Sequence, residues 1–322
     1  MVGRSSAMLE VYDLIERVGP TDATVLITGE TGTGKEIAAE TLHGLSARRS
    51  APLLPLNCSA ISSGLFESEL FGHERGSFTG ADRRRIGHFE HASGGTLLLD
   101  EVTEMPPELQ AKLLRVLENG TLLRVGSSQP VALSVRILAT TNRDPLEAVE
   151  SGRLREDLYH RLNVFPIELP PLRDRGDDVA LLARHFLAEL NQRAGSARCW
   201  SEGALEQLQE RSWPGNVREL RSAVQRAFIL CDSELRIEAL GKPEPTPLRR
   251  AGAPTADGHV GKSLAAVERD LIVATLEQLR GNKRKTAELL GISRKTLYNR
   301  LNGYQMRDIL LRPSAQPARN AD

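Results

Sequence analysis

Residues 29–36 read GETGTGKE, and this short stretch decides the fold. It follows an apolar run at residues 23–28 (ATVLIT) and opens an amphipathic segment at residues 36–45 (EIAAETLHGL). A glycine-rich loop between a buried strand and a helix is the arrangement of a phosphate-binding loop. The glycines let backbone N–H groups face phosphate oxygens, and the helix N-terminus adds its positive dipole. The alternative is a glycine-rich turn that merely contains a lysine, and both flanks disfavour it.

Lys35 and Glu36 close this loop. Lys35 supplies a positive point charge to the phosphates of ATP. Glu36 departs from the general pattern, because a Ser or Thr normally binds Mg²⁺ at this position. We expect ATP contacts along the whole loop, at Gly29, Glu30, Thr31, Gly32, Thr33, Gly34, Lys35 and Glu36.

The metal must therefore depend on other groups, and residues 94–101 (GGTLLLDE) offer them as a buried strand that ends in two carboxylates. We expect Asp100 to hold Mg²⁺ or its water and Glu101 to polarise the attacking water. Gly94 and Gly95 of the same motif are included among the expected ATP contacts. Two solvated carboxylates at a strand end are the alternative, which a preceding phosphate loop disfavours.

The pattern around these motifs predicts the domain organisation. Apolar runs at 52–57, 96–100 and 135–141 alternate with helical patterns such as 108–120, which indicates a parallel sheet with helices on both faces. From Asp177 to about Leu230 the periodicity is mainly helical. Residues 241–261 hold four prolines and four glycines and read as a linker. The expected parts are an α/β subdomain (1–172), a helical subdomain (173–240), the linker (241–261) and a small all-α domain (262–312).

Composition narrows the class of protein. The chain has 322 residues, 40% apolar and 26% charged, which is typical of a globular protein of two or three domains. Its three cysteines lie far apart and resemble neither a zinc site nor a disulfide scaffold. The sequence has no run of about 20 apolar residues and no signal-peptide pattern. We expect a cytoplasmic protein that does not span a membrane.

The charge is concentrated at one end. The whole chain has no net charge, yet residues 259–322 carry twelve Lys and Arg against six Asp and Glu, an excess of six positive charges. Residues 281–304 (GNKRKTAELLGISRKTLYNRLNGY) predict a helix, a turn at 291–293 and a second helix, for which Ser293 is a good N-cap. A basic helix–turn–helix segment favours DNA as the partner. A basic helical hairpin with solvated charges is the alternative.

The second helix of such a motif enters the major groove with its N-terminal part. We expect DNA contacts from the polar residues at its start and outer face: Arg294, Lys295, Thr296, Asn299 and Arg300. We expect the motif to be packed by its apolar residues: Leu289, Leu290, Ile292, Leu297 and Leu301. One module reads a short half-site, so dimer contacts are expected through residues 264–279.

Taken together, these motifs resemble the AAA+ activators of sigma-54 RNA polymerase, from Val2 to about Met306. The Glu that follows the lysine in GETGTGKE looks like that family's own phosphate loop, and GGTLLLDE resembles its second ATPase motif. The resemblance implies an AAA+ P-loop sheet domain with a helical lid. The basic tail is similar to the Fis-type helix–turn–helix domain of many such activators.

The resemblance also implies roles for individual residues. RILATTNRD places Thr141 and Asn142 where the family senses the γ-phosphate, and SWPGNVREL places Arg218 at the second sensor. Asn57, in PLNCSA, matches the asparagine that restrains the catalytic glutamate in the family.

LREDLYHRLNV resembles the arginine-finger segment, with Leu154 where phenylalanine is usual. It implies that Arg155 and Arg161 reach the ATP of a neighbouring subunit, where a guanidinium stabilises the charge of the transferring phosphoryl group. Two surface arginines in ordinary ion pairs are the alternative that the residues alone would favour.

Residues 69–81 (ELFGHERGSFTGA) are the segment that best distinguishes these activators from other AAA+ proteins. They resemble the loop, usually GAFTGA, that these activators press against sigma-54, with Ser77 in place of the alanine. Phe78 and Thr79 are the residues expected to touch the sigma factor. From the residues alone, the segment is a flexible loop that exposes one aromatic side chain, or one whose Phe folds back onto the core.

The function expected from the resemblance is ATP-driven activation of transcription. A homo-oligomeric ring, expected to be a hexamer, would hydrolyse ATP to remodel sigma-54 RNA polymerase, with Mg²⁺ as cofactor and an upstream DNA site as anchor. A DNA-binding regulator that keeps the AAA+ domain mainly as an oligomerisation platform is one alternative. A general AAA+ unfoldase or helicase loader is another. The protein either lacks a sensor domain or is a fragment of a longer protein that has one.

Overall fold

The computed structural model of the chain describes residues 1–59, 63–78, 81–236, 269, 272, 275–276, 283–290, 292, 296–297 and 300. The chain divides into two units, residues 1–247 and 248–322. No helix among the described residues is long and apolar enough to cross a membrane.

The first unit is built on a five-stranded parallel sheet with the order β2-β3-β6-β1-β7. The strands are β1 (Val25–Thr28), β2 (Leu53–Asn57), β3 (Thr96–Asp100), β6 (Arg136–Thr141) and β7 (Phe165–Glu168). The first four lie where apolar runs predict them. Strand β7 was not predicted: it is short and contains Pro166, which an edge strand tolerates because one side of its backbone needs no partner.

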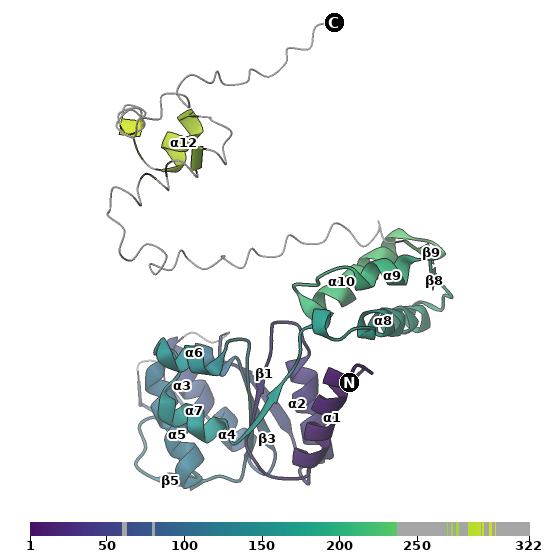
Figure 1. The fold of residues 1–322 in the computed structure, drawn as a ribbon. Helices are drawn as coiled ribbons and strands as arrows, with labels where there is room; N and C mark the ends of the chain where they lie inside the picture. The colour runs from purple at the N-terminus through teal and green to yellow at the C-terminus, as the bar shows by residue number, and fades with distance from the viewer. Residues whose placement is uncertain are drawn as a thin grey trace, which may run out of the picture. The chain divides into compact units, whose positions relative to one another are not determined.

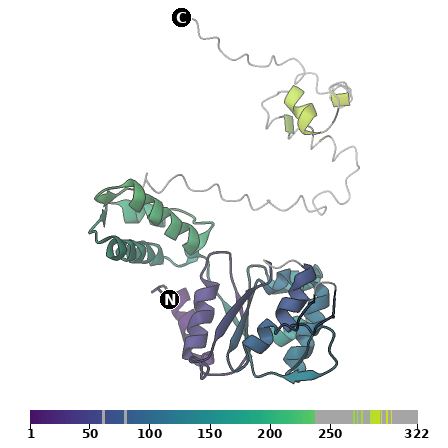
Figure 2. The same ribbon diagram turned by 180° about the vertical axis from the view of Figure 1, so that it is seen from behind.

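Helices cover both faces of this sheet, as the alternating pattern predicts (Figures 1 and 2). One face carries α1 (Ser6–Val18) and α2 (Lys35–Leu45). The other carries α3 (Ser63–Phe71), α4 (His88–His91), α5 (Pro107–Asn119), α6 (Pro145–Glu150) and α7 (Glu156–Leu162).

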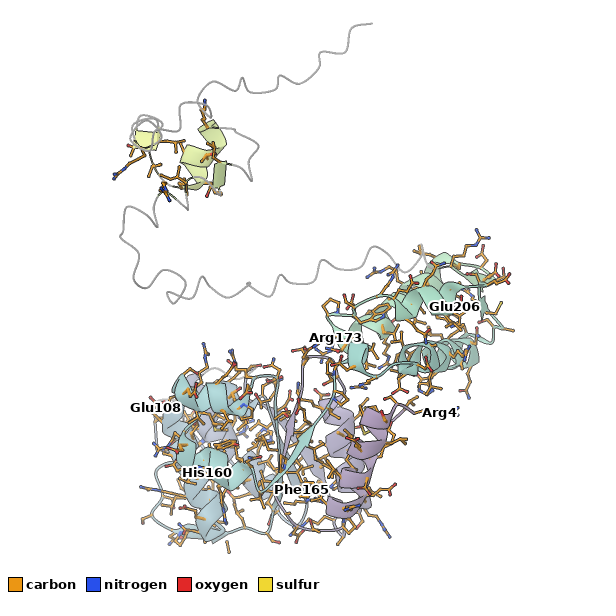
Figure 3. All side chains as sticks on the ribbon, viewed as in Figure 1. Arg4, Glu108, His160, Phe165, Arg173 and Glu206 are labelled. Atoms are coloured by element: carbon orange, nitrogen blue, oxygen red, sulfur yellow. The ribbon has the colours of Figure 1, made fainter. Side chains whose placement is uncertain are left out.

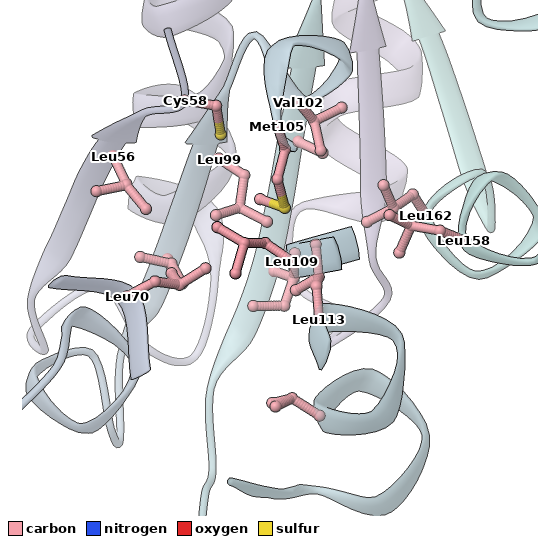
Figure 4. Close-up of a cluster of buried hydrophobic side chains, with 14 of the residues drawn as sticks. Leu56, Cys58, Leu70, Leu99, Val102, Met105, Leu109, Leu113, Leu158 and Leu162 are labelled. Carbon is pink, nitrogen blue, oxygen red and sulfur yellow. The ribbon is translucent and has the colours of Figure 1, made fainter. Parts of the chain in front are cut away.

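Side-chain alternation along the strands produces two separate cores. Leu97 and Leu99 of β3 pack with α5 and α7, whereas Leu98 between them packs with α1 and α2. Figure 4 shows part of the first core, to which Leu99 of β3, Met105 and Leu113 of α5 belong. Each fully buried Leu contributes about 2 kcal/mol, so strand β3 is held firmly from both faces.

A hairpin separates α5 from β6. It consists of β4 (Thr121–Leu123) and β5 (Pro130–Ala132), which pair antiparallel. Its strands are too short for the sequence to predict them, but they determine where the loop at residues 72–85 is attached, as described below.

The helical subdomain has a core of its own. It contains η2 (Leu172–Asp174), α8 (Asp178–Ala194), α9 (Ala204–Gln209) and α10 (Asn216–Leu230). Trp213 and Leu220 pack between these helices. The two-residue strands β8 (Cys199–Trp200) and β9 (Glu234–Leu235) pair in parallel and were not predicted.

In the second unit the structure describes α12 (Lys283–Leu289) and scattered helical residues. Ala287 and Leu297 are buried together with Ile272 and Leu276, and Leu290 and Ile292 pack against them. This confirms three of the predicted packing residues and corrects one. Leu289 is 69% exposed, because Ala287 and Leu290 define the buried side of α12 and Leu289 lies off it. Leu301 and the linker at 241–261 lie outside the described residues.

Candidate nucleotide-binding site

A cavity of about 480 Å³ opens at the carboxyl ends of β1, β3 and β6, beside the N-terminus of α2. In parallel α/β sheets this edge is where ligands bind. The cavity is lined by residues from the phosphate loop, the strand ends and the lid helices: Thr31, Gly32, Gly34, Lys35, Glu36, Ile37, Asn57, Asp100, Glu101, Asn142, Phe186, Val217, Arg218 and Arg221. Of the eight loop residues expected to contact ATP, five therefore line it.

Lys35 begins helix α2 and its side chain is buried. Its Nζ donates to the carbonyl oxygens of Gly29 (2.8 Å) and Glu30 (3.3 Å) and lies 3.7 Å from Oε1 of Glu101. Burial lowers the pKa of Lys35, and the carboxylates of Glu101 and Asp100 oppose that shift. The ammonium is thus held at the cavity wall by the loop that it serves.

Asp100 is the last residue of β3 and is half-buried. Its Oδ1 accepts a 2.6 Å hydrogen bond from the Thr140 hydroxyl, and its Oδ2 accepts one of 3.1 Å from the Asn57 amide. These bonds aim the carboxylate into the cavity and leave lone pairs free for a cation. Mg²⁺ favours oxygen ligands and is usually held by one or two carboxylates together with phosphate oxygens. The residues therefore fit a magnesium ion that arrives with a nucleotide.

Among the residues that the structure describes, there is no group of three or more His, Cys, Asp or Glu side chains that could hold a metal ion. A site that depended on protein ligands alone is therefore not found in that part of the chain.

Glu101 is held in a rarely occupied backbone conformation. Its φ and ψ are 55° and 53°, the left-handed region, which costs a non-glycine residue about 1–3 kcal/mol. Its N–H donates to the Thr140 hydroxyl (3.1 Å), and its Oε2 accepts from the backbone N–H of Asn142 (2.9 Å). Strand β6 thereby fixes both the turn and the carboxylate, as expected of a group that acts on a bound substrate.

Thr140 was not singled out from the sequence, although its hydroxyl joins the Asp100 carboxylate to the backbone N–H of Glu101. Its neighbour Thr141 was predicted to sense the γ-phosphate, but the structure places Thr141 in the core, where its hydroxyl lies 3.0 Å from that of Thr103. The side chains of adjacent strand residues point to opposite sides, so only one of the two threonines can face Asp100. Asn142 does line the cavity, and its amide donates to the Thr31 hydroxyl (3.1 Å).

The structure corrects the prediction for Gly94 and Gly95 and leaves that for Asn57 untested. Gly94 and Gly95 precede the opposite end of β3 from Asp100, a strand length of about 16 Å away. Gly95 packs against β2 instead, since a Cβ there would meet the Pro52 carbonyl oxygen at 2.2 Å. Asn57 lies at the cavity, but its amide bonds to Asp100 in this structure. Its restraint of the glutamate stays a prediction.

The lid brings Arg218 to the cavity from helix α10. The start of this helix is fastened to the phosphate loop by Asn216, which the sequence reasoning missed. Asn216 is fully buried at φ 53°, and its amide donates to Thr31 O and Glu30 Oε2 (3.1 Å each). The Pro-Gly-Asn turn signal before α10 marks the position, but only the fold reveals its partners.

Arg155 and Arg161 are exposed and do not line this cavity. Arg155 pairs with Asp157 two residues on (2.7 Å), and Arg161 donates to the carbonyl of Leu117 at the end of α5 (2.7 Å). Both side chains are therefore free to meet another molecule without breaking a buried contact.

The loop predicted to touch sigma-54 is attached to the β4–β5 hairpin. His73 bridges to both Arg85 and Val125. Phe78 is 40% exposed and meets the edge of the His73 ring, with 5.0 Å between ring centroids. The aromatic ring is neither fully free nor folded into the core. Ser77 is half-buried, whereas Thr79 lies outside the described residues.

Of the residues expected to contact DNA, the structure describes Thr296 and Arg300, both helical and exposed. Arg294, Lys295 and Asn299 lie outside the described residues.

Family models match the chain in three consecutive parts. Residues 1–168 match the Sigma-54 interaction domain, residues 173–243 the AAA+ ATPase lid domain, and residues 263–304 the Bacterial regulatory protein, Fis family. The transcriptional regulatory protein ZraR of Klebsiella oxytoca is 48% identical over 309 residues, which cover 94% of this chain and 68% of that protein. The DNA-binding transcriptional regulator NtrC of Rhizobium meliloti is 42% identical over 332 residues, with 94% and 69% covered.

A solved structure agrees with these relatives. NtrX from Brucella abortus in complex with ATP aligns with a TM-score of 0.68 at 35% identity, over 94% of this chain and 68% of that one. The sheet, the phosphate loop and the lid define a P-loop AAA+ protein. More particularly, the chain belongs to the sigma-54-dependent transcriptional activators with a Fis-type DNA-binding domain. The predicted fold class and family are confirmed.

Proposed function

We propose that this chain is a magnesium-dependent ATPase that works as a ring, expected to be a hexamer, and remodels sigma-54 RNA polymerase in the cytoplasm. The observation that carries the proposal is the cluster of Lys35, Asp100 and Glu101 in one cavity, with Glu101 Oε1 3.7 Å from Lys35 Nζ. NtrX, which aligns over most of the chain, was solved in complex with ATP.

The residues divide the chemistry between them. The loop from Gly29 to Glu36 would cradle the phosphates, with Lys35 as their positive partner. Glu101 would accept the proton of the attacking water, since its carboxylate is aimed by the Asn142 N–H. Asp100 would hold Mg²⁺, which when bound neutralises charge on the phosphate oxygens.

The charge on the transferring phosphoryl group needs a further cation. Arg155 and Arg161 lie outside the cavity of their own subunit, so a neighbouring subunit is the site that they would serve. Hydrolysis would then depend on assembly of the ring.

The loop at residues 72–85 would transmit the effect of hydrolysis to the sigma factor. Phe78 is partly exposed at the loop and would meet the sigma factor together with Thr79. Arg294 and the exposed Arg300 of the Fis-type domain would tether the ring to an upstream DNA site.

In vitro transcription with sigma-54 polymerase, run beside an ATPase assay on the same preparation, tests the proposal. Thr79→Ala should keep substantial ATPase activity and lose promoter opening. Leu146→Ala, at a 58% exposed apolar residue of α6, is the control and should keep both activities. Full promoter opening by Thr79→Ala would contradict the proposal, as would an active wild-type ATPase that opens no sigma-54 promoter.

The DNA part is tested separately, by footprinting and titration at constant salt. Arg300→Ala should weaken specific binding, and a base-reading arginine contributes about 1–3 kcal/mol. ATP turnover should not change.

A further inference from the structure

Glu30 lies within the phosphate loop, yet its carboxylate faces the lid. Arg173 of η2, labelled in Figure 3, holds it with two hydrogen bonds, Nη1 to Oε2 at 2.9 Å and Nη2 to Oε1 at 2.7 Å. This side-by-side geometry is the strong, directional form of an Arg–carboxylate pair. The carboxylate also raises the pKa of Arg173. Glu30 therefore contacts the lid rather than the cavity.

Asn216 extends this contact into the interior. Its Oδ1 accepts from the N–H of Leu172 (2.7 Å), and its amide donates to Glu30 Oε2 and to Thr31 O. A fully buried amide with all of these partners is costly to disturb, because each lost bond leaves a desolvated polar group. Asn216 thus joins η2, the phosphate loop and the first residue of α10.

The phosphate loop also caps the lid helix. The carbonyl oxygen of Gly32 accepts from the N–H groups of Val217 (3.0 Å) and Arg218 (3.3 Å), which the first turn of α10 leaves without intrahelical partners. The contact is close, since a Cβ on Gly32 would meet the carbonyl oxygen of Gly215 at 2.3 Å. Any shift of the loop must therefore move the start of α10, and Arg218 lies within that start.

We infer that Glu30 and Asn216, with Arg173, are positioning residues that lock α10 to the phosphate loop and so determine how Arg218 meets the nucleotide. The inference rests on the proposed function only in taking ATP as the ligand. Glu30, the second residue of the phosphate loop, would contact the lid and would take no part in the chemistry itself.

A double-mutant cycle on the full chain tests this, with binding of ADP and of a non-hydrolysable ATP analogue as the readout. Glu30→Ala and Arg218→Ala should each weaken binding of the ATP analogue about tenfold, and the double variant should be no weaker than the worse single one. Arg173→Ala should behave as Glu30→Ala does, and Arg173→Lys should restore part of the affinity.

Asp22→Ala is the matched control. It removes a similar two-bond pair with Arg48 (2.9 and 3.0 Å), located before β1 at the other end of that strand, and should leave nucleotide affinity unchanged. If Glu30→Ala does not fold, Arg173→Ala carries the same cycle, since Arg173 is exposed.

Three outcomes would overturn the inference: additive losses, unchanged affinity in Glu30→Ala and Arg173→Ala, or an Arg218→Ala variant that binds as wild type does. The proposed function fails by a different result. A wild-type protein that binds the analogue but never hydrolyses ATP would refute the ATPase and leave the cycle intact.

Discussion

Two sets of side chains predicted to act on ATP are held in opposite ways. Asp100 and Glu101 are half-buried at the end of β3, and Thr140 and Asn142 of the neighbouring strand region hold them with hydrogen bonds of 2.6–3.1 Å. Arg155 and Arg161 are exposed at helix α7, where the Arg155 guanidinium bonds to Asp157 and that of Arg161 to the Leu117 carbonyl at the end of α5.

The difference teaches where each set would work. A group that acts in its own cavity gains from being oriented in advance, because no reorganisation is left for the reaction step. A group that acts on a neighbour must stay at the surface until the subunits meet. Under the proposed function, the inner set would be complete within one subunit, and the outer set would need a second subunit.

The largest effect should come from the inner set. Glu101→Gln keeps the shape and the bond to Asn142 N–H but removes the base, so ATP turnover should fall about a thousandfold with nucleotide binding retained. Phosphate release and nucleotide affinity, measured together, check this. Glu104→Gln, at the end of the short 3₁₀ helix η1 (Val102–Glu104), is the control. Near-normal turnover in Glu101→Gln would remove that residue from its proposed role.

Arg155→Ala and Arg161→Ala should each lower turnover about a hundredfold, the effect of removing one charge-stabilising donor. Because the lost charge acts on the neighbour's ATP, mixing either variant with Glu101→Gln should restore some activity at composite sites. Arg153→Ala, at an exposed arginine directly before that segment, is the control. If mixing rescues nothing, the arginines act within their own subunit and the comparison fails.

A smaller effect distinguishes the two adjacent threonines of β6. Thr140→Val removes the hydroxyl that joins Asp100 to Glu101 and should lower turnover about tenfold, since two oriented groups each lose a partner. Thr141→Val breaks a contact with Thr103 in the core and should lower thermal stability more than turnover. Equal losses of turnover would support the sensing role that the resemblance implies for Thr141.

The smallest expected effect concerns Cys58, which lies behind the inner set. Burial raises the pKa of its thiol to about 12, with the carboxylates of Asp100 and Glu101 adding to the shift. A raised pKa means that the thiol stays protonated at pH 8, so iodoacetamide should spare Cys58 and label the exposed Cys199. Mass spectrometry of the alkylated protein measures this, and unfolding in denaturant should make Cys58 reactive. Labelling of native Cys58 at the rate of Cys199 would show that the strand end is open to solvent.

Much of the nucleotide site was predictable because its chemistry is contiguous in the sequence. Lys35 follows its glycines directly, and Asp100 and Glu101 end one apolar strand, so local order alone places each group. Prediction failed where a motif extends past the site. Gly94 and Gly95 share a motif with Asp100, but the strand between them carries the glycines to the other end of the sheet.

Residues that act through partners far away in the chain were not predictable. Thr140 matters because β6 lies beside β3, and Asn216 matters because α10 begins against the phosphate loop, 186 residues from its partner Glu30. The local pattern gives no signal at Thr140, and the Pro-Gly-Asn turn marks the position of Asn216 without revealing its partners.

The sequence by itself determined the class of protein, the phosphate loop, the two carboxylates and four of the five strands, because periodicity and short motifs depend on neighbours along the chain. The tertiary structure decided which groups meet. Thr140 orients the carboxylate of Asp100, and Asn142 orients that of Glu101, whereas Thr141 is buried. Asn216 connects the lid to the phosphate loop. The physical reason is that hydrogen bonds and burial act over a few ångströms in space. Only the folded chain brings residues so distant in sequence within that range.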